Sequence, residues 1–289
     1  MQSDRAPGPL GFQPLFFKYF WSTIRNEVLA AIQEVFSLEK MPRQWKTTYI
    51  VLILKKENPR DVLDYRPISL CNILYKLMAK LLVNHLKPLI PSLVSAEQDA
   101  FVLARNISKN IMVAHEIFHS MSRASPRKSL MIIRADMEKA YDRMSWKFIE
   151  VVLGHYGFHS TFIRWIMTCV THPCFSVIVN GTPSDWFTSS GGLRQGCPLS
   201  PFLFILCSDM LSRSLQHLTE TGGLRAYEPT NSGLSISHLM FADDLLLVAR
   251  ATTWNARILK QTLMKYCIQS GQQININKSH ISFSKRINI

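Results

Sequence analysis

Two adjacent carboxylates, Asp243 and Asp244, are the residues whose types and spacing most directly suggest chemistry. They lie between two short apolar runs, residues 239–241 and 245–248. Apolar runs of this length with polar boundaries are typical of buried strands, so the pattern predicts a hairpin with both aspartates in its turn. Adjacent carboxylates repel, and a divalent cation relieves that repulsion because hard oxygen ligands suit Mg²⁺. Taken alone, the pair fits the N-terminus of a helix better, since carboxylates are also favoured there.

A third carboxylate, Asp136, follows the apolar run 130–135, which we predict to be a strand. Phosphoryl transfer depends mainly on metal ions that bridge the attacking oxygen, the phosphorus and the leaving group. Two ions about 3.5–4 Å apart serve this purpose in polymerases and nucleases. Asp136 and Asp243 can hold such ions if their strands are neighbours in one sheet.

The elements that must position these aspartates alternate between helix and strand. Periodicity and capping residues predict helices at residues 14–41, 73–90, 107–123, 146–153, 161–170, 201–218 and 254–270. Alternating or short apolar runs predict strands at residues 47–54, 130–135 and 274–284, with an extended segment at 65–67 and a hairpin at Asn180-Gly181. Lys76, Lys80 and Lys87 are predicted to mark the exposed face of the second helix. The fold class predicted is α+β with a mainly antiparallel sheet.

Composition narrows the class of protein. The chain has 289 residues, is 47% hydrophobic and 18% charged, and is therefore predicted to be globular rather than disordered. Its formal net charge of +13 favours a polyanionic partner, nucleic acid first, although a generically basic surface would give the same value. The six cysteines form no C-x-x-C pair, which favours buried thiols over a zinc site. No signal-peptide pattern or membrane-length apolar run is present, so we expect an intracellular protein that is neither secreted nor membrane-bound.

Four motifs stand in a fixed order along the chain: ADMEKAYDR, GGLRQGCPLSPFLF, FADD and SGQQININKS. They closely resemble motifs A to D of reverse transcriptases, specifically those of plant-type non-LTR (LINE-like) retrotransposons. Upstream, the segments at residues 64–88 and 97–111 resemble the fingers motifs of the same group, so the resemblance covers nearly the whole chain. FADD alone would be a weak signal, whereas the ordered set is highly specific.

The resemblance implies roles for the acidic motifs. Asp136 and Asp243 would be metal ligands and Asp244 would complete the carboxylate cluster, with two Mg²⁺ as cofactors and Mn²⁺ as a substitute. Tyr141 matches the bulky residue beneath the incoming sugar, where its ring would clash with a 2′-hydroxyl. A packed core aromatic is an alternative for Tyr141 that is compatible with this role.

The resemblance also implies a nucleotide-binding set. Gln195 and Gly196 match the motif B loop, where the absence of a side chain lets backbone come close to nucleotide and template. Lys278 matches the motif D lysine beside the leaving pyrophosphate, with a solvated strand-end lysine as an equally good alternative. Arg66 and Arg105 match fingers arginines near triphosphate or template, with surface salt bridges as the competing explanation.

The implied fold is the fingers and palm of a right-hand polymerase. We expect an N-terminal helical extension at residues 1–36, fingers at about 37–128 and palm at about 129–289. The segment after Lys278 is too short for a helical thumb, so a thumb is expected to be absent.

The implied activity is RNA-directed DNA polymerisation with an RNA template, a DNA primer and dNTPs, in the nucleus or cytoplasm, with the oligomeric state left open. Two alternatives remain. One is a catalytically inactive nucleic-acid-binding remnant. Departures from the family pattern favour it, and they stand at Leu10, Leu54, His85, Ala104, Lys109, Gly191 and Cys197. The other is an RNA-dependent RNA polymerase, against which Tyr141 and the FADD sequence argue.

Overall fold

The structure is a computed structural model that describes residues 6–125, 128–229 and 235–284. Its contacts divide the chain into two compact units, each built from two separate stretches. The first unit contains residues up to 86 together with 153–200, and the second contains residues 87–152 and 201–289. The continuous fingers and palm ranges expected from the sequence do not coincide with these units, and as functional domains they stay a prediction.

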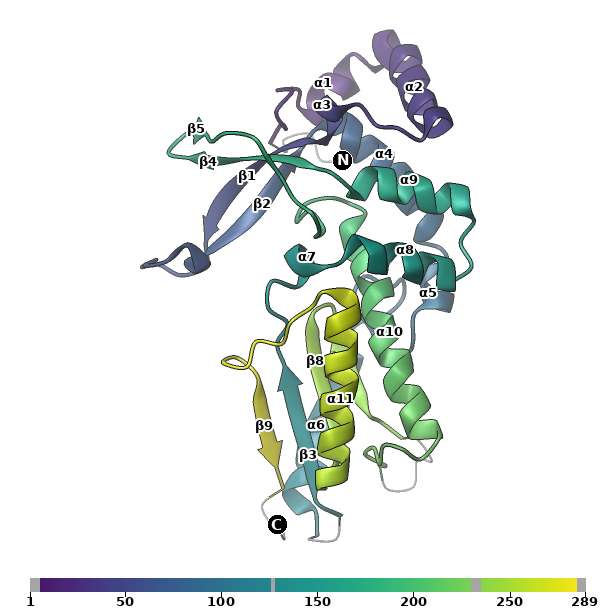
Figure 1. The fold of residues 1–289 in the computed structure, drawn as a ribbon, viewed down its shortest axis with the longest axis vertical. Coiled ribbons are helices and arrows are strands. Elements are labelled where there is room, and N and C mark those ends of the chain that lie inside the picture. Colours follow the sequence, from purple (N-terminus) through teal and green to yellow (C-terminus); the bar gives the residue numbers. More distant parts are fainter. Residues whose placement is uncertain (1–5, 126–127, 230–234, 285–289) are drawn as a thin grey trace. The chain divides into compact units, whose positions relative to one another are not determined.

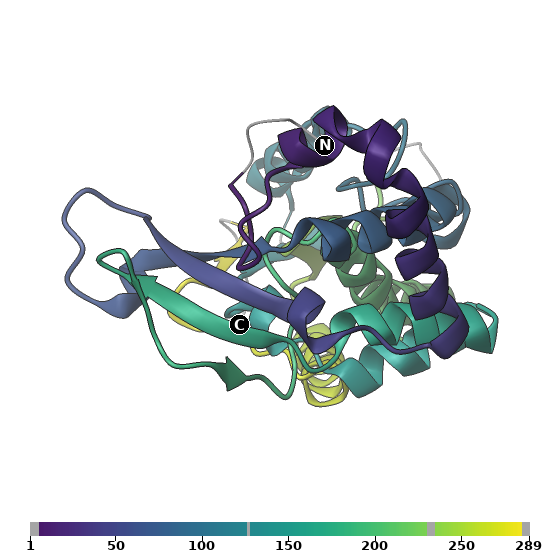
Figure 2. The same ribbon diagram turned by 90° about the horizontal axis from the view of Figure 1, so that it is seen from above.

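The first unit is built on a five-stranded sheet. Its strands are β1 (Thr47–Leu54), β2 (Tyr65–Cys71), β4 (Cys174–Val179), β5 (Thr182–Pro183) and β6 (Phe187–Thr188). β1 pairs antiparallel with β2 and parallel with β4, and β5 and β6 both pair with β4. A short 3₁₀ turn, Val62–Asp64, lies at the end of the β1–β2 hairpin. In both views this hairpin projects beyond the helices of its own unit (Figures 1 and 2).

Five helices accompany this sheet: α1 (Pro14–Tyr19), α2 (Trp21–Leu38), α3 (Arg43–Lys46), α4 (Ile73–Leu86) and α9 (Ser160–Val170). The single N-terminal helix predicted from periodicity is wrong in one respect, because it is interrupted at Phe20. The predicted exposed face of α4 is wrong for Lys76, whose side chain is buried, whereas Lys80 is exposed as expected. The long aliphatic part of a lysine can be buried where the helix has apolar neighbours on more than one side.

The second unit is built on a four-stranded sheet in which every pair is antiparallel. The strand order is β7 (His238–Phe241), β8 (Asp244–Arg250), β3 (Leu130–Ala135) and β9 (His280–Phe283). The α+β class and the antiparallel sheet predicted from the sequence are therefore confirmed. The last strand is shorter than predicted, because residues 276–278 form a turn before β9 begins.

Helices cover both faces of this second sheet (Figure 1). α10 (Ser200–Glu220) and α11 (Thr253–Ser270) cover one face, and α6 (Ile107–Arg123) covers the other. The remaining helices are α5 (Ile90–Leu93), α7 (Ala140–Arg143) and α8 (Trp146–His155), and the division between the two units falls within α8. One core joins Leu245, Leu247 and Ala249 of β8 to residues of α10 and α11. The other joins Val248 to Ile117 of α6. Successive residues of a strand point to opposite faces, so a strand buried on both faces is apolar throughout.

All six cysteines are free thiols. Five of them are buried, as predicted from the sequence, and Cys267 is partly exposed. In the described part of the chain, no helix is both long enough and apolar enough to cross a membrane.

Candidate active site

The β7–β8 hairpin carries the adjacent aspartates at its tip. Phe241 pairs with Asp244, and Ala242 and Asp243 form the two-residue turn between them. The prediction that both aspartates occupy the turn is therefore wrong for Asp244, because the Phe241 pair already closes the hairpin and makes Asp244 the first residue of β8. Ala242 has a positive φ of 54°, as a tight two-residue turn requires at its first position. Both carboxylates are exposed.

Asp136 lies at the matching edge of the neighbouring strand. Ala135, the last residue of β3, pairs with Leu245, so the next position along β3 faces Asp244. Residues opposite one another in antiparallel strands have Cβ atoms about 4.5–5.5 Å apart. The Asp136 backbone is held at both ends: its N–H donates to Ser279 Oγ at 3.1 Å and its carbonyl accepts from Asn275 N at 2.8 Å. The sheet thus brings the three predicted metal ligands to one edge.

The donor set at this edge suits a hard divalent cation. Within the ranges that the structure describes, no three His, Cys, Asp or Glu side chains are gathered closely enough to form a metal cluster by themselves. A closed cluster is not what Mg²⁺ needs, because it is usually held by one or two carboxylates together with waters and substrate phosphates. The residues present therefore fit a magnesium site that the substrate completes.

Tyr141 lies on α7 within electrostatic reach of the hairpin turn. Its ring is stacked on Phe204, with centroids 4.9 Å apart and planes 9° apart. Burial raises the pKa of Tyr141 to about 12, and the negative charge of Asp243 adds to the increase. The structure thus gives Tyr141 the core packing that the sequence allowed and also a position near the candidate metal ligands. Phe204, which sequence reasoning missed, forms one wall for the Tyr141 ring.

Lys278 lies in the turn that holds Asp136. Asn275 Oδ1 accepts from Lys278 N at 3.3 Å, and the Asn275 N–H is the group that binds the Asp136 carbonyl. The Lys278 side chain is exposed. The strand-end position considered for this lysine is not observed, because β9 begins only at His280.

Gln195, Gly196 and Arg66 belong to the first unit. Ser69 N donates to the Gln195 carbonyl at 2.8 Å, which ties the loop to β2. Gly196 has a φ of 115°, and a Cβ added there would lie 2.8 Å from the Ser69 carbonyl oxygen. Glycine is therefore required at this position for backbone geometry as well as for space. The Arg66 side chain is exposed on the same strand.

Arg105 has a structural role that the nucleotide-binding prediction did not anticipate. Its guanidinium donates to the backbone carbonyls of Pro91, Val94, Ser95 and Gln98. Arginine has five N–H donors. Here they bind backbone carbonyls between residues 91 and 98, in α5 and the segment after it. Through these bonds Arg105 holds the segment that precedes it, and its contact with triphosphate or template stays a prediction.

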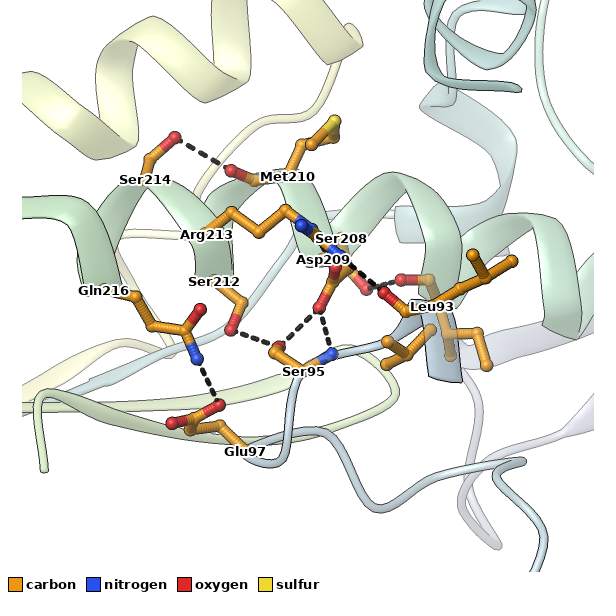
Figure 3. A network of polar contacts seen from close by, with 12 residues as sticks. Leu93, Ser95, Glu97, Ser208, Asp209, Met210, Ser212, Arg213, Ser214 and Gln216 are labelled. Carbon is orange, nitrogen blue, oxygen red and sulfur yellow. Dashed lines mark hydrogen bonds and ion pairs between the residues drawn. The ribbon is translucent and has the colours of Figure 1, made fainter. Parts of the chain in front are cut away.

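A polar network links α10 to the segment before α6 and to β7, and sequence reasoning did not find it. Figure 3 shows the part around Ser95, Asp209 and Ser212. Asp209 of α10 accepts hydrogen bonds from the backbone and hydroxyl of Ser95. Ser95 Oγ lies 2.6 Å from Ser212 Oγ, which lies 2.6 Å from His238 Nε2 at the start of β7. His238 Nδ1 is 2.8 Å from Ser237 Oγ. Each member is a common surface residue type, and no local spacing marks it as buried.

This network makes stability depend on pH. Burial lowers the pKa of His238 to about 4, although the charges of Glu97 and Asp209 act in the opposite direction. The neutral ring is favoured in the folded state, so this contribution to stability is fully present above the unfolded pKa of about 6.5 and is lost as pH falls towards 4. We expect His238 to account for about 3 kcal/mol of destabilisation over that range. Urea unfolding at several pH values measures it.

His238→Gln should lose the part of the pH dependence that arises between pH 6.5 and 4. His115→Gln is the matched control, because His115 is exposed on α6. An unchanged pH dependence in His238→Gln would show that the network does not depend on a neutral ring.

A family model and several known proteins resemble this chain. A family model described as "Reverse transcriptase (RNA-dependent DNA polymerase)" matches residues 53–288. The "Transposon TX1 uncharacterized 149 kDa protein" of Xenopus laevis is 28% identical over 280 residues, which cover 96% of this chain and 21% of that protein. The "Retrovirus-related Pol polyprotein from type-2 retrotransposable element R2DM" of Drosophila melanogaster is 26% identical over 273 residues, covering 94% of this chain and 24% of that protein.

A third relative and a solved structure add to this comparison. The "Uncharacterized mitochondrial protein AtMg01250" of Arabidopsis thaliana is 47% identical over 114 residues, which cover 39% of this chain and 93% of that protein. Apo telomerase from Candida tropicalis, truncated from its C-terminal domain, matches 84% of this chain and 51% of its own at a TM-score of 0.57 and 16% identity. That likeness shows a shared fingers and palm fold. The chain spans about a fifth to a quarter of the TX1 and R2DM proteins. It belongs to the reverse transcriptase family, as a reverse transcriptase domain of the non-LTR retrotransposon type.

Proposed function

We propose that this chain is the catalytic core of an RNA-directed DNA polymerase that extends a primer 3′-hydroxyl on an RNA template with dNTPs. The observation that carries the proposal is the strand register that brings Asp136 opposite Asp244, with Asp243 in the adjoining turn. Three carboxylates at one sheet edge suit two-metal phosphoryl transfer, and they stand on backbone that two strands and a tight turn make rigid.

In this proposal Asp136, Asp243 and Asp244 hold two Mg²⁺, for which Mn²⁺ is a substitute. When bound, the metal ions would activate the primer hydroxyl and neutralise charge on the transferred phosphate. Lys278 stands in the turn attached to Asp136, so its ammonium group can stabilise or protonate the leaving pyrophosphate. Because the side chain of Lys278 is exposed, it can move to the substrate without breaking a packed contact.

Residues of the first unit have a separate part in the proposal. Arg66 is exposed beside the loop that Gln195 and Gly196 form against β2, and a cation there can offset the charge of a phosphate. Gly196 lets this loop lie directly against β2, because a Cβ there would lie 2.8 Å from the Ser69 carbonyl oxygen. We propose that these residues contact the template or the nucleotide. The identity of 47% to the Arabidopsis protein also supports a plant-type element.

Primer extension with purified protein tests the proposal. With an RNA template, a DNA primer, dNTPs and Mg²⁺, we expect extended products that disappear when EDTA is added. Ribonucleotides in place of dNTPs test an RNA-polymerase alternative, and they should be incorporated poorly. Nucleic-acid binding without any extension would support the inactive remnant instead.

Tyr141→Ala is expected to raise the ratio of ribonucleotide to deoxynucleotide incorporation. Removing the ring opens space for a 2′-hydroxyl, and a steric clash of this kind contributes about 1–3 kcal/mol, or roughly 10–200-fold in selectivity. Single-nucleotide incorporation with matched rNTP and dNTP measures the ratio. Tyr156→Ala is a suitable control, because this tyrosine lies elsewhere in the chain, directly after α8. If the ratio of ribonucleotide to deoxynucleotide incorporation is unchanged in Tyr141→Ala, the role of Tyr141 is core packing alone.

Nucleic-acid affinity is expected to fall steeply with salt. The formal net charge is +13, and cationic side chains that neutralise phosphates release counterions. A protein that makes 6–10 phosphate contacts loses roughly 10³–10⁵ in affinity between 50 and 200 mM salt. Fluorescence anisotropy with a labelled RNA·DNA duplex measures the slope. Affinity that is independent of salt would contradict a phosphate-based interface.

A further inference from the structure

A short segment that precedes α6 lies beside β7, the edge strand of the second sheet, and is firmly attached to α10. We call residues 93–98 the strap. Arg213 donates to the Leu93 carbonyl at 2.6 Å, Asp209 binds Ser95, and Gln216 donates to Glu97 Oε2 at 2.7 Å (Figure 3). The strap is therefore fixed by three successive turns of one helix, and side chains that it carries have a defined position.

The strap also pairs with β7 through its backbone. Gln98 and Met240 form an isolated parallel bridge, and Met240 N donates to the Glu97 carbonyl at 2.9 Å. Asn110 of α6 donates to the carbonyls of both Glu97 and Met240, at 3.2 and 3.0 Å. The residue two positions before the turn is thus connected to the strap and to α6 at once.

The side chain of Gln98 binds the turn itself. It is fully buried, and its Oε1 accepts from Ala242 N at 3.0 Å while its Nε2 lies 3.4 Å from the Ala242 carbonyl oxygen. The same Oε1 accepts from Ala100 N at 3.0 Å. One carboxamide therefore contacts both the N–H and the carbonyl oxygen of Ala242, the residue that immediately precedes Asp243. Ala242 has a positive φ, which alanine adopts reluctantly, so external bonds are needed to keep it there.

We propose that Gln98 is a positioning residue that fixes the Ala242 conformation and so aims the Asp243 carboxylate at the metal. The inference rests on the proposed function, since it assigns Asp243 as a metal ligand. Groups that orient a ligand from behind set metal affinity, and their loss commonly weakens it 10–100-fold. Gln98 does not touch the substrate; it acts through the turn.

Gln98→Met tests this role, because methionine is similar in length and lacks the carboxamide. We expect Mn²⁺ affinity, measured by electron paramagnetic resonance on the protein without nucleotide, to fall by roughly 10–100-fold. Hydrogen exchange at the Ala242 amide should become about tenfold faster, as expected for the loss of one buried hydrogen bond. In primer extension the midpoint for Mg²⁺ should rise while the dissociation constant for template-primer is unchanged.

Asn255→Leu is the matched control. Asn255 is also fully buried in the second unit, and its carboxamide binds the backbone of Arg225 and Arg250 at the opposite end of β8. It should lose stability with unchanged Mn²⁺ affinity. Equal loss of Mn²⁺ affinity in both variants would overturn the proposal, because general destabilisation would then explain it.

A double variant, Gln98→Met with Ala242→Gly, keeps the test decisive if Gln98→Met folds poorly. Glycine adopts a positive φ without strain, so it should restore part of the lost Mn²⁺ affinity. A role of Gln98 in core packing alone predicts no such rescue, and its absence would overturn the proposal. Wild-type protein that binds Mn²⁺ through Asp243 but extends no primer would contradict the proposed polymerase activity and leave the role of Gln98 intact.

Discussion

Asp243→Asn is expected to reduce primer extension by roughly 1000-fold or more, equivalent to a loss of about 4 kcal/mol of transition-state stabilisation. The substitution keeps the size of the side chain and removes the charge that would hold the metal. Because Asp243 is exposed in the turn, the free energy of unfolding should change by less than about 0.5 kcal/mol. Single-turnover extension and urea unfolding measure the two quantities on the same preparation.

Asp185→Asn is the control for this prediction. Asp185 is also exposed, and it lies in the first unit after β5. It should keep wild-type extension and wild-type stability. Near wild-type extension by Asp243→Asn would show that Asp243 is not a metal ligand, and it would contradict the proposed mechanism.

Arg194→Met is expected to destabilise the protein by about 3 kcal/mol. Arg194 is buried in the first unit, where its guanidinium lies 3.9 Å from the centre of the Tyr75 ring. It also donates to the Cys169 carbonyl and to Thr48 Oγ1. Methionine fills much of the volume but leaves that carbonyl without its donor. The midpoint of urea unfolding measures the loss.

Arg25→Met separates this effect from the general loss of one positive charge. Arg25 is exposed on α2, and its substitution should change stability by less than about 0.5 kcal/mol. Because Arg194 directly precedes Gln195, the variant should also accelerate hydrogen exchange at Ser69, whose N–H donates to the Gln195 carbonyl. Equal stability of the two variants would show that the buried contacts of Arg194 contribute nothing net.

Sequence patterns predicted the elements of the site well because these depend on local periodicity. The bounds of β3 and of α6 are those predicted. The hairpin predicted around the FADD aspartates is also present, as β7 and β8. Asp136 is at the exit of its strand, as predicted from the end of an apolar run. These features follow from the alternation of apolar and polar side chains and from helix capping. Each of these signals depends only on residues that are close together in the sequence.

What the sequence could not predict depends on contacts between distant residues. Gln98 binds a turn 144 positions away along the chain. Arg105 matched a ligand-binding pattern but donates to backbone carbonyls, and Lys76 followed the helical period of exposed lysines but is buried. In each case the residue type is common on surfaces, and tertiary structure alone decides its partner. The hydrogen-bonded network of His238 was missed for the same reason.

The central position of β3 has a consequence for how the protein is made. β3 pairs with β8 and with β9, so Asp136 is held by strands that the ribosome synthesises more than a hundred residues later. Pairings between such distant segments form slowly, because the chain must first lose the entropy of a long loop. Nascent chains that end before β9 leave one edge of β3 open to pairing with other molecules. The candidate metal site is therefore among the last parts of the second unit to be completed, and we expect a chaperone that shields β3 during synthesis to raise the yield of folded protein.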